Sequence, residues 1–432
     1  MIGYLLLMML RVVWDQIISL LVSRPNQDKE EHWIHDILEF AKSQGFELEE
    51  HHVHTPDGFV LVMFRIKTEK RGPPVLFMHG LCQSCECFIT DRDSLAFSMA
   101  TKGYDVWLGN ARGNRYSYKN TKLTPKQEEY WDFSMDEMAL VDLPLMILHV
   151  LEHSKYLKLD YVGFSQGTAI GFACFSVRKD IADKVSNFLA ISPAGRLNRL
   201  PNPVIRAIVS TDPKLVFKIF GKKSVLPSVF FWRRVLSKQA FLDAMEKSVN
   251  HIFGWTMTNV VSHQKYFLYS NLYSFTSTKV IVHWMQIMSS GVLEMFDDDV
   301  HHLKANRGRR TPIYPLDRIP CKIHLLYGNK DLNLINIANL IESLPQVPNQ
   351  VSVHCFNSLE HLDLIYCSKE HGVNDVSLSC LVSLSDSVLI PRIALQRRVS
   401  RDNTSKLEKP AFKRERAKSS CMQNLKNANF NQ

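Results

Sequence analysis

The chain has 432 residues, of which 45% are hydrophobic, so it can bury one large domain with insertions or two ordinary domains. Its formal net charge of +9 would suit a nucleic-acid-binding protein. The segment 392–432, however, holds eleven Lys and Arg against three Asp and Glu, so the rest of the chain is nearly neutral. We therefore predict no nucleic-acid partner, and a basic disordered tail at 392–432 in preference to a binding site for anionic lipid.

The first 23 residues form the most apolar segment, with twelve Leu, Ile and Val. These contribute about −4 to −7 kcal/mol to membrane insertion, whereas Arg11 and Asp15 cost about +5 to +7 kcal/mol at a bilayer centre unless they pair on one helix face. No basic residue precedes the apolar run and no small-x-small site follows it, which argues against a cleaved signal peptide. We predict a retained membrane anchor at 1–23, either spanning or interfacial; an amphipathic helix packed on the protein's own body is the alternative.

Nine cysteines are spread along the chain without a paired framework, and its one Asn-x-Ser/Thr sequon, at Asn403, lies in the tail. This pattern indicates a globular part that faces a reducing compartment. The closest group is Cys82, Cys85 and Cys87, and no second pair or histidine set follows it at zinc-finger spacing. We interpret these residues as free thiols and expect neither a metal nor a cofactor.

From residue 45 onward, short apolar runs rich in β-branched and aromatic residues alternate with helical segments such as 135–153. The runs predicted as strands are 59–66, 75–78, 105–108, 160–164, 188–191, 322–327 and 351–356. This alternation predicts an α/β fold with a mostly parallel sheet and helices on both faces. In such sheets the chemistry lies at the carboxyl ends of the strands.

The strand at 160–164 leads into a serine between two glycines, in the sequence Gly163-Phe164-Ser165-Gln166-Gly167. Glycines at this spacing permit a tight strand-to-helix turn that exposes the serine hydroxyl. The pattern alone also occurs by chance, so it needs partners. Asp331 follows the strand at 322–327, and His361 follows the last predicted strand. Nucleophile, acid and histidine therefore occur in the chain order of an α/β-hydrolase triad.

Each of these residues has a predicted role. His361 takes the proton from the Ser165 hydroxyl, while Asp331 fixes the imidazole tautomer and stabilises its charged form. The backbone N–H groups of Leu81, which follows His79 and Gly80, and of Gln166 are predicted to form the oxyanion hole.

Other residues of the same types fit these roles less well. Asp317 precedes its strand rather than following it, and Asp363 is too near His361 in the sequence to occupy the loop that carries the acid. His354 lies inside a predicted strand. We therefore keep Asp331 and His361 as the predicted acid and base.

Five motifs together resemble the acid lipase family, which holds the lysosomal and gastric lipases and the fungal steryl ester hydrolases. They are His79-Gly80-Leu81, LGNARGNRYS at 108–117, WDFSMDEMALVDLP at 131–144, GFSQGT at 163–168 and HLDLI at 361–365. The run EEHHVHTPDGFVLVMFRI at 49–66 is also similar to the family's first hairpin. The likeness implies an α/β-hydrolase fold with an inserted helical cap.

The sequence departs from the family in two places. Phe164 stands where the lysosomal and gastric branches typically carry a histidine, which, with the apolar N-terminus and the basic tail, favours the membrane-anchored fungal steryl esterases. After Ile365 the sequence no longer resembles the family's closing helix.

Composition and the family resemblance together predict five segments. They are an anchor at 1–23, a hydrolase core at 24–195 and 313–391, a cap and lid at 196–312, and a tail at 392–432.

The predicted cap is rich in aromatic residues, which suit an apolar substrate. They are Phe230, Phe231, Trp232, Phe253, Trp255, Phe267 and Trp284. We expect a membrane-associated serine ester hydrolase of neutral lipids, with steryl esters as substrate and triacylglycerol as the alternative; the alternative from another class is a non-catalytic lipid-binding or tethering protein. The expected location is the endoplasmic reticulum membrane or the lipid droplet, with the catalytic domain in the cytosol.

Overall fold

The computed structural model describes most of the chain between residues 27 and 381. The described ranges are 27–69, 71–198, 216–217, 221–225, 235–260, 265–298, 311–332, 334–367 and 369–381. They fall within one compact unit, Met1–Ser387. The predicted anchor at 1–23 and the predicted tail at 392–432 lie outside them. None of the helices in these ranges has both the length and the apolar character needed to span a membrane.

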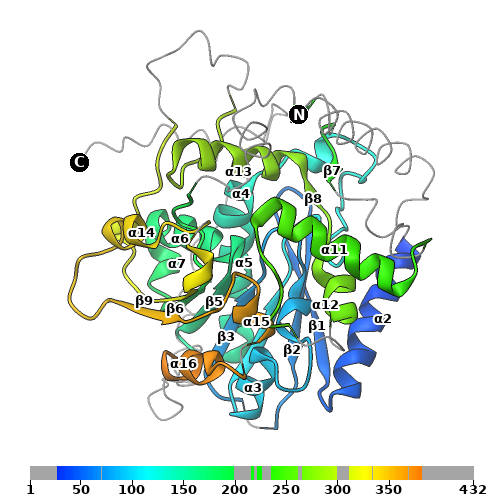
Figure 1. Cartoon of the computed structure of the whole chain (residues 1–432), viewed down its shortest axis with the longest axis horizontal. Coiled ribbons are helices and arrows are strands. Elements are labelled where there is room, and N and C mark those ends of the chain that lie inside the picture. The colour runs from blue at the N-terminus through cyan, green and yellow to red at the C-terminus, as the bar shows by residue number, and fades with distance from the viewer. Residues whose placement is uncertain are drawn as a thin grey trace, which may run out of the picture. The chain divides into compact units, whose positions relative to one another are not determined.

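An eight-stranded sheet forms the centre of this unit, in the order β1-β2-β4-β3-β5-β6-β9-β10 (Figure 1). The strands are β1 Leu48–His54, β2 Val60–Ile66, β3 Pro74–Met78, β4 Asp105–Gly109, β5 Leu159–Phe164, β6 Val185–Ile191, β9 Lys322–Gly328 and β10 Val351–Phe356. β1, β2 and β4 are joined by antiparallel pairing, and the strands from β4 to β10 run parallel. The predicted fold and the seven predicted strands are confirmed.

Helices cover both faces of this sheet. They are α2 Gln27–Ser43, α3 Leu95–Thr101, α4 Met135–Glu137, α5 Leu143–Ser154, α6 Gln166–Val177, α7 Lys179–Ala182, α14 Ile337–Ser343, α15 Asp363–Tyr366 and α16 Val373–Ser379. Because side chains alternate along a strand, Val75 and Phe77 of β3 join a buried cluster with α2, α3 and α16. Leu76 and Met78 point to the opposite face, which α5 and α6 cover.

The predicted helix at 135–153 forms as one helical stretch with an irregular centre. It begins with a capping box, in which Ser134 Oγ accepts from the Asp136 N–H at 3.1 Å and Glu137 Oε2 accepts from the Ser134 N–H at 2.7 Å. A π-helical turn, Met138–Asp142, joins α4 to α5. Lys155 ends α5 in the left-handed conformation, with φ of 63°.

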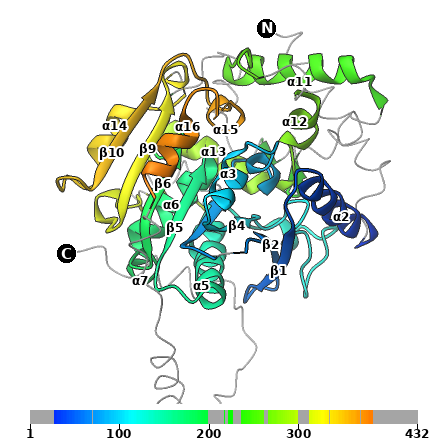
Figure 2. The ribbon, with the colours of Figure 1, turned by 90° about the horizontal axis from the view of Figure 1, so that it is seen from below.

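The described residues between β6 and β9 are mainly helical. They form α11 Lys238–Phe253, α12 Lys265–Leu272, α13 Thr278–Ser290 and the short pair β7 Ser224–Val225 and β8 Thr276–Ser277. Figure 2 shows α11 at the same end of the sheet as α15. Asp136 ties the following segment to the core, because its carboxylate accepts from Tyr314 Oη at 2.7 Å and from the Phe296 N–H at 2.9 Å. The aromatic residues Phe230, Phe231 and Trp232, and the side chain of Phe267, lie outside the described residues.

The segment after Ile365, where the family likeness ends, forms the short helix α16. This helix packs against α3, and Asn374 Nδ2 donates to the Asp93 carbonyl oxygen at 3.0 Å. Val373 and Ser377 of α16 are fully buried. The chain therefore closes this face of the sheet with a sequence that differs from the family pattern.

Candidate active site

Ser165 lies at a sharp turn between β5 and α6. Its backbone has φ of 50° and ψ of −113°, which is a rare conformation for a residue with a side chain. The two flanking glycines make the turn possible. A Cβ atom at Gly167 would lie 2.1 Å from the Met78 carbonyl oxygen, and one at Gly163 would lie 2.8 Å from the Gly167 backbone. Both contacts are with backbone atoms, so no side-chain movement could relieve them.

The structure brings Ser165, His361 and Asp331 together from three separate loops. His361 Nε2 lies 2.8 Å from Ser165 Oγ, and His361 Nδ1 lies 2.6 Å from Asp331 Oδ2. Asp331 follows β9 in a 3₁₀ turn, and His361 follows β10. The His361 side chain is 4% exposed and that of Asp331 is 0% exposed. This continuous hydrogen-bonded chain can move a proton off the serine hydroxyl.

The environment of Asp331 works both for and against its charge. Burial raises the pKa of Asp331, while the His361 imidazole and, more weakly, the Trp255 indole act to lower it. A buried carboxylate beside an imidazole is stabilised further when the imidazole becomes charged. Asp331 is therefore placed to stabilise a cation that forms on His361.

An aromatic stack fixes the plane of the His361 ring. Trp255, from the segment after α11, stacks on it with ring centroids 4.6 Å apart and an angle of 6° between the planes. Phe253 stacks on the far side of Trp255 at 4.3 Å, and Phe164 contacts His361 at 5.4 Å. Trp255 was predicted only as one of the aromatic residues of the cap, and its contact with His361 was not predicted.

Glu360 joins the segment that carries Trp255 to the loop that carries His361. Its Oε2 accepts from the backbone N–H groups of Thr256 at 2.8 Å and Met257 at 3.0 Å. Ser192 Oγ in turn donates to the His361 carbonyl oxygen at 2.8 Å. The histidine is thus held through its backbone as well as through its ring.

The residues considered as rival acids and bases have other surroundings. Asp363 Oδ2 accepts from the Glu360 N–H at 2.8 Å and from Asn259 Nδ2 at 2.7 Å, so this carboxylate holds the histidine loop in shape. Asp317 lies in a 3₁₀ turn ahead of β9, and His354 lies within β10. None of the three makes a described hydrogen bond to His361.

The backbone N–H groups of Leu81 and Gln166, the predicted oxyanion donors, belong to two segments that meet at Ser165, since a Cβ atom at Gly80 would lie 3.2 Å from Ser165 Cβ. Gln166 begins α6, and Leu81 follows the end of β3, which α6 touches at Gly167. Among the described residues, neither N–H donates to a backbone carbonyl of a turn or loop. The side chain of Gln166 is fixed by Trp284 of α13, whose Nε1 donates to Gln166 Oε1 at 2.7 Å.

His79 shapes the loop that carries Leu81. Burial lowers the pKa of His79 to about 4, so its ring is neutral at pH 7. Its Nε2 accepts from the Ala111 N–H at 3.1 Å, which leaves the proton on Nδ1, 2.8 Å from the Gly80 carbonyl oxygen. Asn114 Nδ2 approaches the same Nε2 at 3.2 Å. The histidine is therefore a structural link between two strand-end loops.

The other motifs of the sequence meet around a buried guanidinium. Arg112 Nε donates to Asp142 Oδ2 at 2.9 Å, and its Nη1 donates to Asp57 Oδ2 at 2.6 Å. Three motifs that are distant in the sequence thus share one ion-pair network. Breaking one partner of such a network leaves an uncompensated buried charge, which costs about 3–5 kcal/mol.

Cys82, Cys85 and Cys87 are free thiols near the Leu81 loop. All three are buried, and burial raises the pKa of Cys82 to about 12. Burial also raises the pKa values of Cys85 and Cys87 far above their ordinary range. These thiols are therefore neutral at pH 7, and thiolates are the form that binds metals.

Comparisons with known proteins agree with this fold. A model of a partial α/β-hydrolase lipase region matches residues 37–92, and a model of the α/β hydrolase fold matches residues 73–222. A probable lipase of Schizosaccharomyces pombe is 36% identical over 340 residues, which cover 77% of this chain and 76% of that protein. The gastric triacylglycerol lipase of Mus musculus is 34% identical over 340 residues, covering 74% and 85%.

A solved structure supports the fold alone. A soluble variant of the monoglyceride lipase from Saccharomyces cerevisiae, in complex with a substrate analog, matches with a TM-score of 0.50 and 13% sequence identity. The match covers 78% of this chain and 96% of that one.

The pKa of His79 predicts acid sensitivity. The unfolded chain binds a proton at this residue below about pH 6.5, whereas the folded chain binds it only near pH 4, so the free energy of unfolding falls as the pH is lowered between these values. At pH 5 the free energy of unfolding that is lost through His79 is about 2 kcal/mol.

Urea unfolding at pH 7 and pH 5 should show a smaller loss of unfolding free energy in His79→Gln than in the wild type. His52→Ala, which removes an exposed histidine, is the control and should behave as the wild type. Equal losses in all three proteins would contradict this account of His79.

Proposed function

Because this chain belongs to the acid lipase family of α/β-hydrolases, we propose that it is a serine carboxylic ester hydrolase whose triad is Ser165, His361 and Asp331. The observation that carries the proposal is the hydrogen-bonded chain from Ser165 Oγ through His361 to Asp331, with distances of 2.8 and 2.6 Å. A protein that only bound lipid would not need this hydrogen-bonded chain.

The reaction begins with attack of Ser165 Oγ on the ester carbonyl carbon. His361 Nε2 takes the hydroxyl proton as the new bond forms, and Asp331 stabilises the resulting imidazolium. The carbonyl oxygen becomes an oxyanion and accepts hydrogen bonds from the N–H groups of Leu81 and Gln166. Loss of one donor of this kind costs about 2.7–4 kcal/mol of transition-state stabilisation.

Three further proton transfers complete the cycle. The His361 imidazolium gives its proton to the leaving alcohol oxygen, which leaves the acyl group on Ser165. A water molecule then attacks this acyl-enzyme while His361 takes one of its protons. When the second oxyanion collapses, the carboxylic acid is released and His361 gives the proton to Ser165 Oγ, which restores the hydroxyl.

Neutral lipid esters are the substrate class that the surroundings of the triad favour. Trp255 and Phe164 contact the His361 ring, and Phe253 stacks on Trp255, so aromatic side chains offer apolar surface next to the reacting bond. Each methylene of an acyl chain buried on such surface contributes about 0.8 kcal/mol. Small charged esters have no long acyl chain to bury on this apolar surface, so they gain no binding energy from it.

Within this class, steryl esters are our proposed substrate. Phe164 in place of the histidine that is typical of the lysosomal and gastric branches supports this choice, as does the apolar segment 1–23. Triacylglycerol is the second candidate, because one of the similar proteins is named a gastric triacylglycerol lipase.

The proposed location is the endoplasmic reticulum membrane or the lipid droplet, with the catalytic domain in the cytosol. Steryl esters and triacylglycerols dissolve poorly in water, so their hydrolase must reach an interface. Residues 1–23 have an insertion balance near zero, which is compatible with a bilayer span or a shallow seat on a lipid surface.

Substitutions in the triad test the proposed mechanism. Ser165→Ala and His361→Ala should each lower kcat on a short-chain p-nitrophenyl ester by about 10⁶-fold, and Asp331→Asn by about 10⁴-fold. Circular dichroism should show that each variant is folded. Asp317→Asn is the matched control and should keep full activity. The assignment of the acid is wrong if Asp317→Asn loses activity and Asp331→Asn does not.

Side-by-side hydrolysis of cholesteryl oleate and trioleoylglycerol in the same detergent tests the proposed substrate. Both esters carry the same acyl chain, so a difference in kcat/KM reports the alcohol portion. We expect the higher value for cholesteryl oleate, and the reverse order would favour the triacylglycerol alternative. Retention of activity on the short-chain ester in each preparation controls for loss of folded enzyme.

Deletion of residues 1–23 tests the proposed anchor. The deletion should move much of the protein from the membrane fraction to the supernatant while activity on a short-chain ester is kept, because the triad and the residues packed around it lie within 27–381. Deletion of 392–432 is the matched control. Release of the full-length protein by high salt alone would instead implicate the basic tail, since salt screens charge attraction but does not weaken apolar burial.

A further inference from the structure

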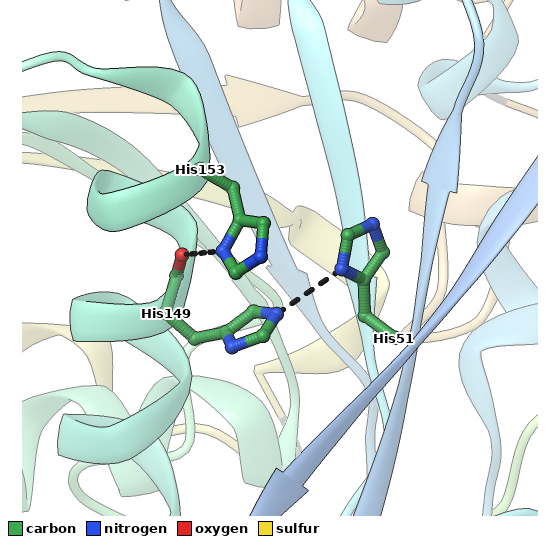
Figure 3. Close-up of side chains that lie close together, drawn as sticks. All are labelled: His51, His149 and His153. Atoms are coloured by element: carbon green, nitrogen blue, oxygen red, sulfur yellow. Dashed lines mark hydrogen bonds between the residues drawn. The ribbon is translucent and has the colours of Figure 1, made fainter.

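Three histidines that the proposed reaction does not use lie close together on the antiparallel side of the sheet. His51 is on β1, and His149 and His153 are on α5 (Figure 3). Residues four apart on a helix share one face, so both α5 imidazoles turn toward β1. One ring nitrogen from each residue lies within 4.8 Å of the other two.

The spacing of the nitrogens resembles that of ligands around a single metal ion. His149 Nε2 and His51 Nδ1 lie 3.2 Å apart. Two imidazole nitrogens bound at about 2.05 Å to one tetrahedral zinc ion lie about 3.3 Å apart. The pair therefore needs almost no movement to bind an ion between its two rings. In the absence of an ion, one nitrogen of the pair carries a proton that the metal would replace.

The outer nitrogens have surroundings that are typical of metal-binding histidines. His153 Nδ1 lies 2.8 Å from the His149 carbonyl oxygen, which holds the proton on Nδ1 and leaves the lone pair on Nε2. His51 Nε2 lies 3.4 Å from Glu49 Oε1 and is buried without a hydrogen-bond partner among the described residues. A carboxylate behind the ring increases the basicity of the nitrogen that faces the metal.

The site is closed on one side and open on the other. The Trp107 ring lies 4.6 Å from His51 and 5.9 Å from His149, so it forms an apolar floor. The side chain of His153 is exposed, and solvent can supply a fourth ligand there.

We propose that His51, His149 and His153 form a binding site for a divalent late first-row transition metal, with Zn²⁺ as the expected ion. Three imidazoles suit such ions, and Mg²⁺ or Ca²⁺ would instead require oxygen ligands. The ion would clamp β1 to α5. β1 lies four strand spacings from β5, which carries Ser165, or roughly 19 Å across the sheet. The site therefore acts on the stability of the fold and takes no part in ester cleavage.

A second group, His324, His354 and Cys380, is less suited to a metal. His324 Nδ1 and His354 Nε2 both bind Ser352 Oγ, at 2.7 and 3.1 Å. Burial raises the pKa of Cys380, which disfavours the thiolate that a metal requires. This group serves as the control site in the test.

The test uses the full chain without an affinity tag, purified in detergent, stripped with EDTA and titrated with ZnCl₂ by calorimetry. The wild type should bind about one Zn²⁺ per chain at this site, and Zn²⁺ should raise the melting temperature. His149→Ala should weaken Zn²⁺ binding by about 10–100-fold or more, because removal of a group that only hydrogen-bonds to a metal ligand already weakens binding by that factor. His153→Gln changes an exposed residue and is the second variant in case His149→Ala does not fold. His52→Ala, on the opposite face of β1, and His354→Ala, in the control site, should bind as the wild type.

The outcomes separate the alternatives. The site is supported if His149→Ala and His153→Gln each lose one equivalent of bound Zn²⁺ while His52→Ala and His354→Ala lose none. Binding that persists in His149→Ala and His153→Gln overturns it, as does loss in His354→Ala alone. A wild type that binds no Zn²⁺ up to millimolar concentrations would overturn the proposal and show that the three imidazoles only pack against one another.

Discussion

The close approach of α6 to the end of β3 is the contact on which the rest of the site depends. Gly167 packs so tightly on the Met78 carbonyl oxygen that a Cβ atom would lie 2.1 Å from it. This contact holds Ser165 in its turn with φ of 50°, which directs the hydroxyl away from the sheet. It also places the N–H of Gln166 beside the loop that follows Met78, where Leu81 lies. One backbone contact thus positions the nucleophile and both proposed oxyanion donors.

His361, the proposed catalytic base, depends on the inserted helical segment as much as on the sheet. Trp255 comes from that segment, stacks on His361 and faces Asp331. Glu360 accepts from two backbone N–H groups next to Trp255, so the histidine loop and the insertion are fixed to each other. Movement of this part of the insertion would move the base itself. Binding of an acyl chain against Trp255 and activation of Ser165 are therefore physically linked.

Much of the fold and the central residues of the site could be predicted from the sequence because their signals are local. The strands appear as apolar runs, and the order of Ser165, Asp331 and His361 after three of them predicts that they meet at one edge of the sheet. The stack of Trp255 on His361 joins residues more than 100 positions apart, and no sequence period encodes it. No sequence period encodes the contact of His51 with His149 either, since the position of β1 against α5 is set only by tertiary packing. The anchor at 1–23 and the tail at 392–432 stay predictions.

Covalent labelling tests the central claim, that the hydrogen-bonded chain to His361 makes Ser165 a nucleophile. The purified protein would be treated with a long-chain alkyl fluorophosphonate, which reacts with activated serine hydroxyls, then digested and analysed by mass spectrometry. We predict one adduct per chain, on the peptide that contains Ser165, and labelling that is slowed by several orders of magnitude in His361→Ala. An adduct on another serine, or labelling of Ser165 at an unchanged rate in His361→Ala, would contradict the account.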